Sequence, residues 1–205
     1  MAKDYSRKVV SDTLDLYDMG KVVSPRDFHK VDGDDYVMYE DAEQIYFVIK
    51  SKSDEYVFTN YGLIHVDGAN GALEKRVVKR YDFYYYDVCG VTLETAGTID
   101  LDVEIKFSFG NVQFSIDVDK KYINKLKCLY KALIEISRLQ ILNAELQRDS
   151  REALKLACET LSNSRTENLS VHLLKELVRF KYQWLRDSKE LNNNKDFGEI
   201  FMKYI

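Results

Sequence analysis

Residues that interrupt helices are scarce in this sequence and unevenly placed. Among 205 residues there is one proline, Pro25, and there are nine glycines, of which eight precede residue 111 and the ninth is Gly198. The stretch 111–197 therefore contains no residue that breaks a helix through its backbone. Turn residues in the first half and unbroken segments in the second predict an α+β protein, with a β-rich module followed by a helical module.

Long apolar runs and paired cysteines are also absent. No stretch approaches the ~20 apolar residues that span a bilayer, and the first twenty residues carry charges where a secretory signal needs an apolar run. Cys89, Cys128 and Cys158 lie far apart without a CxxC pair, which indicates reduced core thiols rather than a disulfide framework or a zinc site. We therefore expect a cytoplasmic protein that needs no metal or other cofactor.

Charge of one sign is depleted in each half of the chain. Residues 1–120 contain 14 lysines and arginines against 23 aspartates and glutamates, a net charge of −9, whereas residues 121–205 contain 16 against 11, a net charge of +5. Together they give the formal net charge of −4. An acidic half and a basic half favour contacts between copies of the chain in which unlike halves meet.

The first 43 residues resemble an adaptor segment more than a domain. Val10, Leu14 and Tyr17 have helical spacing and predict a short amphipathic helix. Ser24 followed by Pro25 is typical of the start of another helix. We expect residues 1–43 to form a helical or irregular segment.

From residue 44 the hydrophobic period changes to two, and β-branched and aromatic residues dominate. The clearest case runs from Leu101 to Phe109, where apolar residues alternate with charged or small polar ones, so one face must be buried. Short sequential strands separated by turn residues predict a seven-stranded antiparallel β barrel or sandwich. The predicted strands are residues 45–49, 55–58, 62–66, 74–82, 88–95, 101–109 and 112–118.

Helical periodicity begins after Asp119. The leucines and isoleucine between Leu126 and Ile136 form an apolar stripe suited to covering an open end of the barrel. Since the pattern continues, we expect one long helix to about residue 161. Ser164 begins a capping-box spacing that predicts a second helix over 167–191, antiparallel to the first. The predicted domains are 44–138 for the β module with its capping helix and 139–205 for a helical hairpin with a tail.

Two segments carry a resemblance to a known family. Phe58-Thr59-Asn60, with a leucine-isoleucine pair and a glycine turn downstream, is similar to a pattern of bacterial pleckstrin-homology-like domains. Residues 93–106, LETAGTIDLDVEIK, resemble the ETAGTFDLDAELK signature of a bacterial pleckstrin-homology-like family of unknown function, some members of which carry a helical hairpin. Ile99 and Val103 depart from that signature. The resemblance covers residues 40–138, and architecture alone extends it to 191.

This resemblance implies a pleckstrin-homology-like fold that assembles into rings or other homo-oligomers and has no catalytic activity attached to it. Unpaired strand edges and aromatic side chains are typical subunit contacts, so we expect the signature turn and the aromatic run before it to form an oligomer interface. The alternative is that the signature only shapes a tight turn within one subunit. The interface candidates are Phe83, Tyr84, Tyr85, Tyr86, Thr95, Ala96, Gly97, Thr98 and Asp100.

Residues suited to catalysis are not grouped. His29, His65 and His172 lie in three different modules, and none of the common nucleophile, metal or phosphate-loop motifs is present. We therefore predict a non-enzymatic, self-assembling interaction module, a scaffold or adaptor that also binds another protein.

An anionic surface is the alternative partner, either nucleic acid or membrane lipid. Acidic neighbours balance many basic residues of the second half, which favours solvated helix faces over a nucleic-acid site. A specific lipid is disfavoured because Lys50 and Lys52 are followed at once by Asp54 and Glu55. The candidate anion contacts are Lys121, Lys125, Lys127, Lys131, Arg138, Arg148, Arg151 and Arg165.

Overall fold

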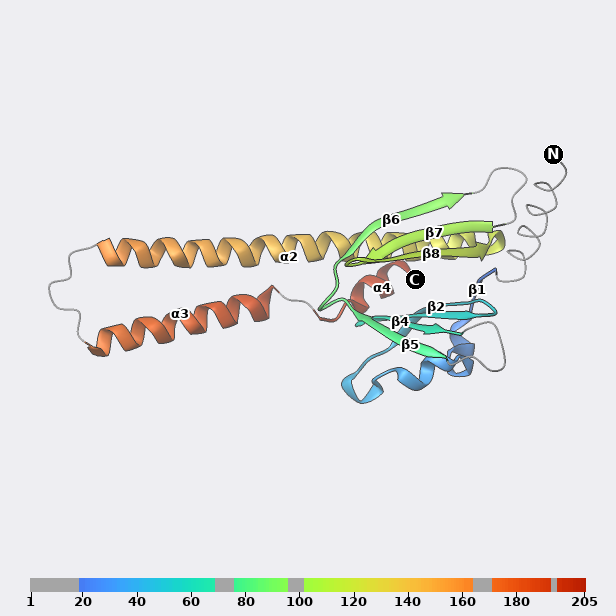
Figure 1. Ribbon diagram of the computed structural model, residues 1–205, viewed down its shortest axis with the longest axis horizontal. Helices are drawn as coiled ribbons and strands as arrows, with labels where there is room; N and C mark the ends of the chain where they lie inside the picture. The colour runs from blue at the N-terminus through green and yellow to red at the C-terminus, as the bar shows by residue number, and fades with distance from the viewer. Residues whose placement is uncertain (1–18, 69–75, 96–101, 164–170, 193–194) are drawn as a thin grey trace, which may run out of the picture. The chain divides into compact units, whose positions relative to one another are not determined.

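The structure is a computed structural model that describes residues 19–68, 76–95, 102–163, 171–192 and 195–205 (Figure 1). The chain divides into two compact units. Unit 1 contains the residues up to Ser137 together with Lys195–Ile205, and unit 2 contains Arg138–Asn194. The helix predicted around Val10 lies outside the described residues.

Unit 1 contains two antiparallel sheets. One has the strand order β1-β2-β3-β4-β5 and the other the order β6-β7-β8. The seven predicted strands are confirmed, and the two-residue β1 is an addition. The strands are β1 (Lys21–Val22), β2 (Ile45–Lys50), β3 (Asp54–Thr59), β4 (Gly62–Asp67), β5 (Val77–Asp82), β6 (Val88–Thr95), β7 (Asp102–Phe109) and β8 (Val112–Asp119).

Of the two forms predicted for the seven strands, a barrel or a sandwich, no closed barrel is present among the described residues, whose strands form two separate sheets. After β5 the chain turns at residues 83–86 and enters a second sheet, so the described pairing is divided between two sheets. Just before β1, Gly20 links the two sheets through a single parallel bridge to Val118 in β8. Its amide donates to the carbonyl oxygen of Asp117 at 2.8 Å. A Cβ at Gly20 would lie 2.9 Å from that oxygen, so the close approach requires glycine.

The core lies between the two sheets and under the first turns of the long helix. Strand β7 alternates partly exposed and buried positions along its whole length, as its sequence predicts. Helix α2 (Ile123–Asn163) follows the 3₁₀ turn η4 (Lys120–Tyr122). Leu126, Leu129, Leu133 and Ile136 are fully buried, which confirms the predicted covering stripe. Burial stabilises the fold by about 1.5–3 kcal/mol for each such side chain, as an upper bound.

Three short 3₁₀ helices precede β2: η1 (Pro25–Lys30), η2 (Asp32–Tyr36) and η3 (Tyr39–Asp41). Ser24 is extended and Pro25 occupies the first turn of η1, as the sequence predicts. The carboxylate of Glu55 accepts a 2.9 Å hydrogen bond from the amide of Gly33. This buried contact fixes η2 against strand β3.

The chain returns to unit 1 after the hairpin, a feature that the sequence interpretation missed. Helix α4 (Gly198–Tyr204) packs between α2 and β2 (Figure 1). Phe197 and Phe201 are almost completely buried. Phe197 meets Phe83 edge to face at 5.1 Å between ring centroids, and Phe201 stacks on Tyr46 at 5.3 Å. Residues far along the sequence therefore complete the core of unit 1.

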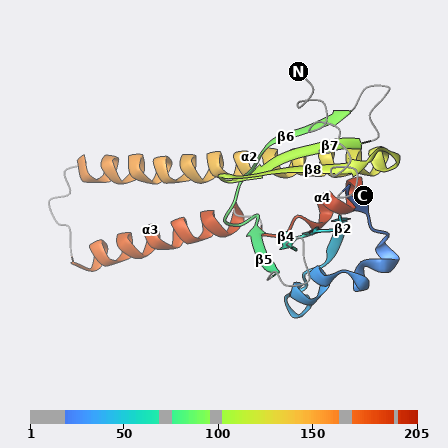
Figure 2. The same cartoon turned by 45° about the vertical axis from the view of Figure 1, so that its right-hand side comes forward.

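Unit 2 is the predicted antiparallel helical hairpin. The part of α2 beyond Ser137 and helix α3 (Val171–Leu191) run side by side in both views (Figures 1 and 2). The side-chain amide of Gln147 donates to the carbonyl oxygen of Asn192 at 3.0 Å, which joins the base of the two helices. The capping box predicted at Ser164 lies outside the described residues.

Candidate functional site

The hairpin of unit 2 exposes most of its apolar side chains. Among the side chains described in this unit, only Gln140 and Leu154 are buried. The described side chains of this unit therefore bury little apolar surface between the two helices. The large exposed apolar residues are Ile141, Leu142, Leu146, Leu156, Val178, Phe180, Tyr182, Trp184, Leu185 and Leu191.

These apolar residues occupy particular helix faces. At 3.6 residues per turn, Leu142 and Leu156 lie on the side of α2 away from the buried Leu154. On α3, Phe180 and Trp184 are one turn apart, and their ring centroids are 5.9 Å from one another. About half of each of these two rings is exposed. The two helices therefore offer apolar faces that the hairpin itself does not cover.

The aromatic run named as an interface candidate is divided between the core and the surface. Phe83 is buried against Phe109 and Phe197, so its hydrophobic area serves the fold of one subunit. Tyr85 is 75% exposed, and the Lys195 ammonium lies 4.9 Å from the ring centroid of Tyr84. Tyr86 and Thr95 are exposed, whereas Ala96, Gly97, Thr98 and Asp100 lie outside the described residues.

The basic residues named as anion contacts do not form one cluster. Lys125 lies on the opposite side of α2 from Lys127 and Lys131 by the helical period, and Lys125 contacts the Tyr122 ring. Arg148 pairs with the adjacent Asp149 at 3.7 Å. Lys121, Lys125, Lys127 and Lys131 belong to unit 1, Arg138, Arg148 and Arg151 belong to unit 2, and Arg165 lies outside the described residues.

The Phe58-Thr59-Asn60 motif has a structural function. The Thr59 hydroxyl donates to the carboxylate of Glu43 at 2.5 Å, and Arg80 donates to both oxygens of the same carboxylate at 2.9 and 3.0 Å. The Glu43 side chain is fully buried. Burial is the largest single influence and opposes the charge on Arg80, but the hydrogen bonds and negative charges of Glu43 and Asp82 together outweigh it and raise the pKa of Arg80. The motif thus organises a buried ion pair at one end of the sheet.

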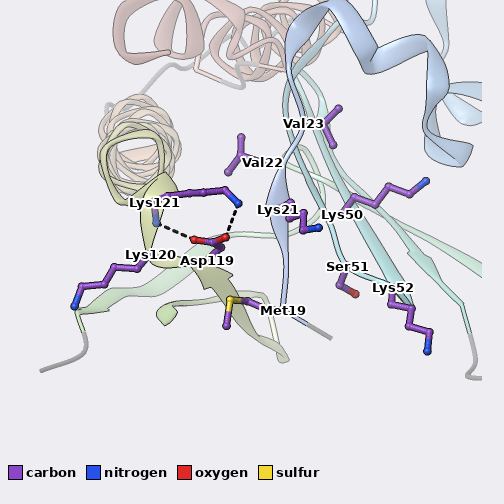
Figure 3. A pocket seen from close by; sticks show the side chains of 10 residues that line it. All are labelled: Met19, Lys21, Val22, Val23, Lys50, Ser51, Lys52, Asp119, Lys120 and Lys121. Carbon is purple, nitrogen blue, oxygen red and sulfur yellow. Dashed lines mark hydrogen bonds and ion pairs between the residues drawn. The ribbon is translucent and has the colours of Figure 1, made fainter. Parts of the chain in front are cut away.

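A lysine-lined hollow lies where β1, the β2–β3 hairpin and the start of the long helix meet (Figure 3). We call it the lysine hollow. Lys21 comes from β1, Lys50 and Lys52 from the hairpin, and Lys120 and Lys121 from η4. Met19, Val22, Val23, Ser51 and Asp119 complete the lining.

The one acidic residue that lines the hollow is bound to the helix start. Asp119 accepts a 3.0 Å hydrogen bond from the amide of Lys121 and pairs with its ammonium at 2.5 Å. The hydrogen bond from the Lys121 side chain holds the pKa of Asp119 below its usual value, and Asp119 raises the pKa of Lys121 in return. Lys50 pairs with the buried carboxylate of Glu55.

The histidines offer no metal site in the part of the chain that the structure describes. His65 contacts Asp54 at 2.9 Å and stacks on Tyr56 at 4.6 Å between centroids. Both partners lie on the neighbouring strand β3, so the His65 side chain takes part in packing the sheet. No group of three or more histidine, cysteine, aspartate or glutamate side chains suited to a metal ion occurs among the described residues. Within the same ranges, no helix combines the length and apolar composition that crossing a bilayer requires.

Two antiparallel sheets covered by a C-terminal helix and extended by a helical hairpin define a pleckstrin-homology-like protein. The chain belongs to the bacterial PH domain family, whose model matches residues 13–137. A second model, the YvbH-like oligomerisation region, matches residues 149–205. These matches confirm the family resemblance of the ETAGTIDLDVEIK segment.

Two relatives are similar to the chain along nearly its whole length. It is 48% identical over 200 residues to the uncharacterized protein YvbH of Bacillus subtilis (strain 168), which covers 97% of this chain and 98% of that protein. It is 44% identical to a PH-domain-containing bacterial protein from Exiguobacterium sibiricum 255-15, whose crystal structure superposes with a TM-score of 0.84 and covers 92% of this chain and 100% of that one.

Proposed function

We propose that the protein is a non-enzymatic, self-assembling scaffold or adaptor and that the hairpin of unit 2 carries a contact between copies. The observation that carries this proposal is the set of exposed apolar side chains on α2 and α3, in a unit with a single described buried apolar residue, Leu154. The match of residues 149–205 to a region named for oligomerisation supports the same function.

The proposed contact buries apolar side chains that the described part of the hairpin leaves exposed. A buried aromatic side chain removes about 150–250 Å² from water, and each Å² of apolar area contributes about 25 cal/mol. Phe180 and Trp184 together therefore contribute several kcal/mol before the cost of ordering two chains. A second copy presents the same apolar surface, so we expect a contact in which the same face of each hairpin packs against the other. Charged residues such as Arg179 and Glu176, which pair at 3.0 Å on α3, surround it with a polar rim.

Sedimentation equilibrium of the full chain at micromolar concentration in 0.15 M salt tests the proposal. We expect an oligomer for the natural sequence and a shift toward monomer for the double variant Phe180→Ser/Trp184→Ser. The matched control is Lys175→Ser/Gln183→Ser, which places two serines at exposed polar positions of the same helix. Circular dichroism of both variants reports whether α3 stays helical.

A monomer at every concentration for the natural sequence would refute self-assembly. An unchanged oligomer for a folded Phe180→Ser/Trp184→Ser variant would refute the hairpin as the contact. Equal dissociation of the control variant would show that helix stability, and not the apolar face, decides the assembly.

A further inference from the structure

We propose that a tyrosine-lined pocket at one end of the five-stranded sheet binds a small organic cation through a quaternary ammonium group, an activity separate from self-assembly. The pocket has a volume of about 520 Å³, within the usual range for ligand sites of roughly 300–1000 Å³. We call it the tyrosine pocket. Its aromatic and acidic lining residues are Tyr61, Tyr84, Tyr85, Asp41, Asp82 and Asp196.

Three parts of unit 1 that are distant in the sequence form this pocket. Tyr61 lies in the turn between β3 and β4, Tyr84 in the turn after β5, and Asp196 in the segment that leads into α4. The carbonyl oxygen of Tyr61 accepts from the amide of Phe83 at 2.8 Å, and the same turn accepts from the amide of Phe197 at 2.9 Å. Backbone hydrogen bonds therefore hold the walls in place before any ligand binds, which lowers the cost of binding.

One aromatic face of the pocket already holds a cation. The Lys195 ammonium lies 4.9 Å from the ring centroid of Tyr84, the distance of a cation–π contact. Tyr85 meets Tyr84 at 4.8 Å between ring centroids with the two rings almost perpendicular, which restricts the orientation of the Tyr84 ring. Lys195 is exposed, so a cation from solution can replace its ammonium on the ring.

The lining of the pocket is negative overall, although several of its charges are paired. Arg80 also lines the pocket, but it pairs with the carboxylates of both Glu43 and Asp82. Two negative charges therefore surround this one guanidinium. The other charged lining residues are two aspartates and one lysine, which leaves an excess of negative charge for a cationic ligand.

The hydroxyl of Tyr61 lies in the same negative field. It donates to the carbonyl oxygen of Asp41 at 2.6 Å. Burial raises the pKa of Tyr61, and the negative charges of Asp196, Asp41 and Glu43 raise it further. Charges that disfavour a tyrosinate anion favour a cation at the same place, so this wall of the pocket supports the same ligand charge.

The carboxylates of the pocket supply charge but few open hydrogen-bond acceptors. Arg80 donates through Nε to Asp82 at 2.6 Å. The two oxygens of Asp196 accept from the side-chain amide of Asn60 at 2.9 Å and from the amide of Gly198 at 2.8 Å. A primary ammonium needs acceptors for three N–H donors when it leaves water. A quaternary ammonium needs none, and its methyl groups pack against aromatic faces, so this is the cation that the pocket fits.

Isothermal titration of the full chain with choline chloride tests the proposal, with methylamine hydrochloride as the comparison cation. Both probes carry one positive charge, but only choline has no N–H donor. The test variants are Tyr84→Leu, which removes the aromatic face, and Lys195→Gln, which removes the competing ammonium. Their matched controls are Tyr84→Phe, which keeps a ring, and Lys203→Gln, which removes a lysine 4.9 Å from the Tyr204 ring centroid outside the pocket.

We expect choline to bind the natural sequence at least about fivefold more tightly than methylammonium does, and Tyr84→Leu to weaken choline binding by about fivefold, the size of one cation–π contact. Tyr84→Phe should keep the affinity within about twofold, because the ring face remains. Lys195→Gln should tighten choline binding by at least about threefold and Lys203→Gln by less than about 1.5-fold, since only Lys195 competes for the ring. Circular dichroism reports whether each variant is folded.

Absence of choline binding overturns the proposal. Equal affinity for the two cations also overturns it, because it would assign the attraction to net charge alone. An unchanged affinity in a folded Tyr84→Leu variant, or equal effects of Lys195→Gln and Lys203→Gln, would place the ligand outside the tyrosine pocket and would overturn the proposal as well.

Discussion

Asn60 and Asp196 lie 136 positions apart in the chain, and the side-chain amide of Asn60 donates a 2.9 Å hydrogen bond to the Asp196 carboxylate. The carbonyl oxygen of Asn60 also accepts from the amide of Phe197 at 2.9 Å. The turn after β3 is therefore the docking point for the segment that returns from the hairpin. The following aromatic residues then enter the core of unit 1.

Replacing Phe201 by alanine should destabilise unit 1 by about 3–5 kcal/mol, because it leaves a cavity where the ring stacked on Tyr46. Urea unfolding monitored by tyrosine fluorescence measures the loss. Met202→Ala, at the adjacent exposed position, is the control and should change stability by less than about 0.5 kcal/mol. A loss below about 1 kcal/mol for Phe201→Ala would contradict the docked position of α4.

Removing Arg80 should cost about 3–5 kcal/mol, because Arg80→Ala leaves the fully buried Glu43 carboxylate without its main counter-charge. The neighbouring pair Lys79–Asp67 is exposed on both sides, so Lys79→Ala should cost less than about 1 kcal/mol. Chemical denaturation of the two variants compares them directly. Similar small losses would show that the buried pair is not what holds this end of the sheet.

The Asp119–Lys121 pair predicts a dependence on acid pH. Since the hydrogen bond from Lys121 lowers the pKa of Asp119 in the folded chain below its ordinary value of 3.8, the folded state binds that proton less readily than the unfolded state. The stability from this pair is complete above about pH 4 and is lost as the pH falls through the folded pKa. Carboxyl ¹³C NMR should place the Asp119 midpoint below 3.8 and move it upward in Lys121→Gln. An unmoved midpoint would rule out Lys121 as the cause.

The signature turn remains a predicted interface. Gly97→Trp should dissociate an assembly into folded monomers if this turn contacts another copy, and it should abolish folding if the turn only closes one subunit. Tyr85→Ala gives an independent test because Tyr85 is 75% exposed: we expect weaker assembly with stability changed by less than about 0.5 kcal/mol. Light scattering and thermal unfolding separate these effects. An unchanged oligomer in both variants would exclude the interface.

The sequence patterns predicted the individual strands and helices better than the way in which the strands pair into sheets. The alternation from Leu101 to Phe109 and the stripe from Leu126 to Ile136 each reflect one buried face, so strand β7 and the start of α2 could be identified from the sequence. Period two predicts strands but not which edges pair, so it left both a barrel and a sandwich open, and only the structure shows two separate sheets. Strand β1 contains only two residues, too few for any periodicity.

The lysine hollow could not be found by reading along the chain. The sequence interpretation weighed Lys50 and Lys52 against Asp54 and Glu55 alone. In the structure, Asp54 contacts His65 on the next strand, whereas the buried Glu55 accepts from the Gly33 amide and also pairs with Lys50. The other lysines of the hollow come from β1 and η4, about 30 and 70 positions away in the chain, and only the fold brings them together.

The return of the chain to unit 1 also orders events during synthesis. Translation reaches Phe197 and Phe201 only after the whole hairpin, residues 138–194, has been made. Until then the growing chain has the eight strands and the first turns of α2, but the space around Phe83 and Tyr46 lacks the two rings that fill it. A nascent chain paused within the hairpin would therefore expose an aromatic-lined gap to chaperones or to other chains. The apolar faces of unit 2 are therefore synthesised before unit 1 is complete.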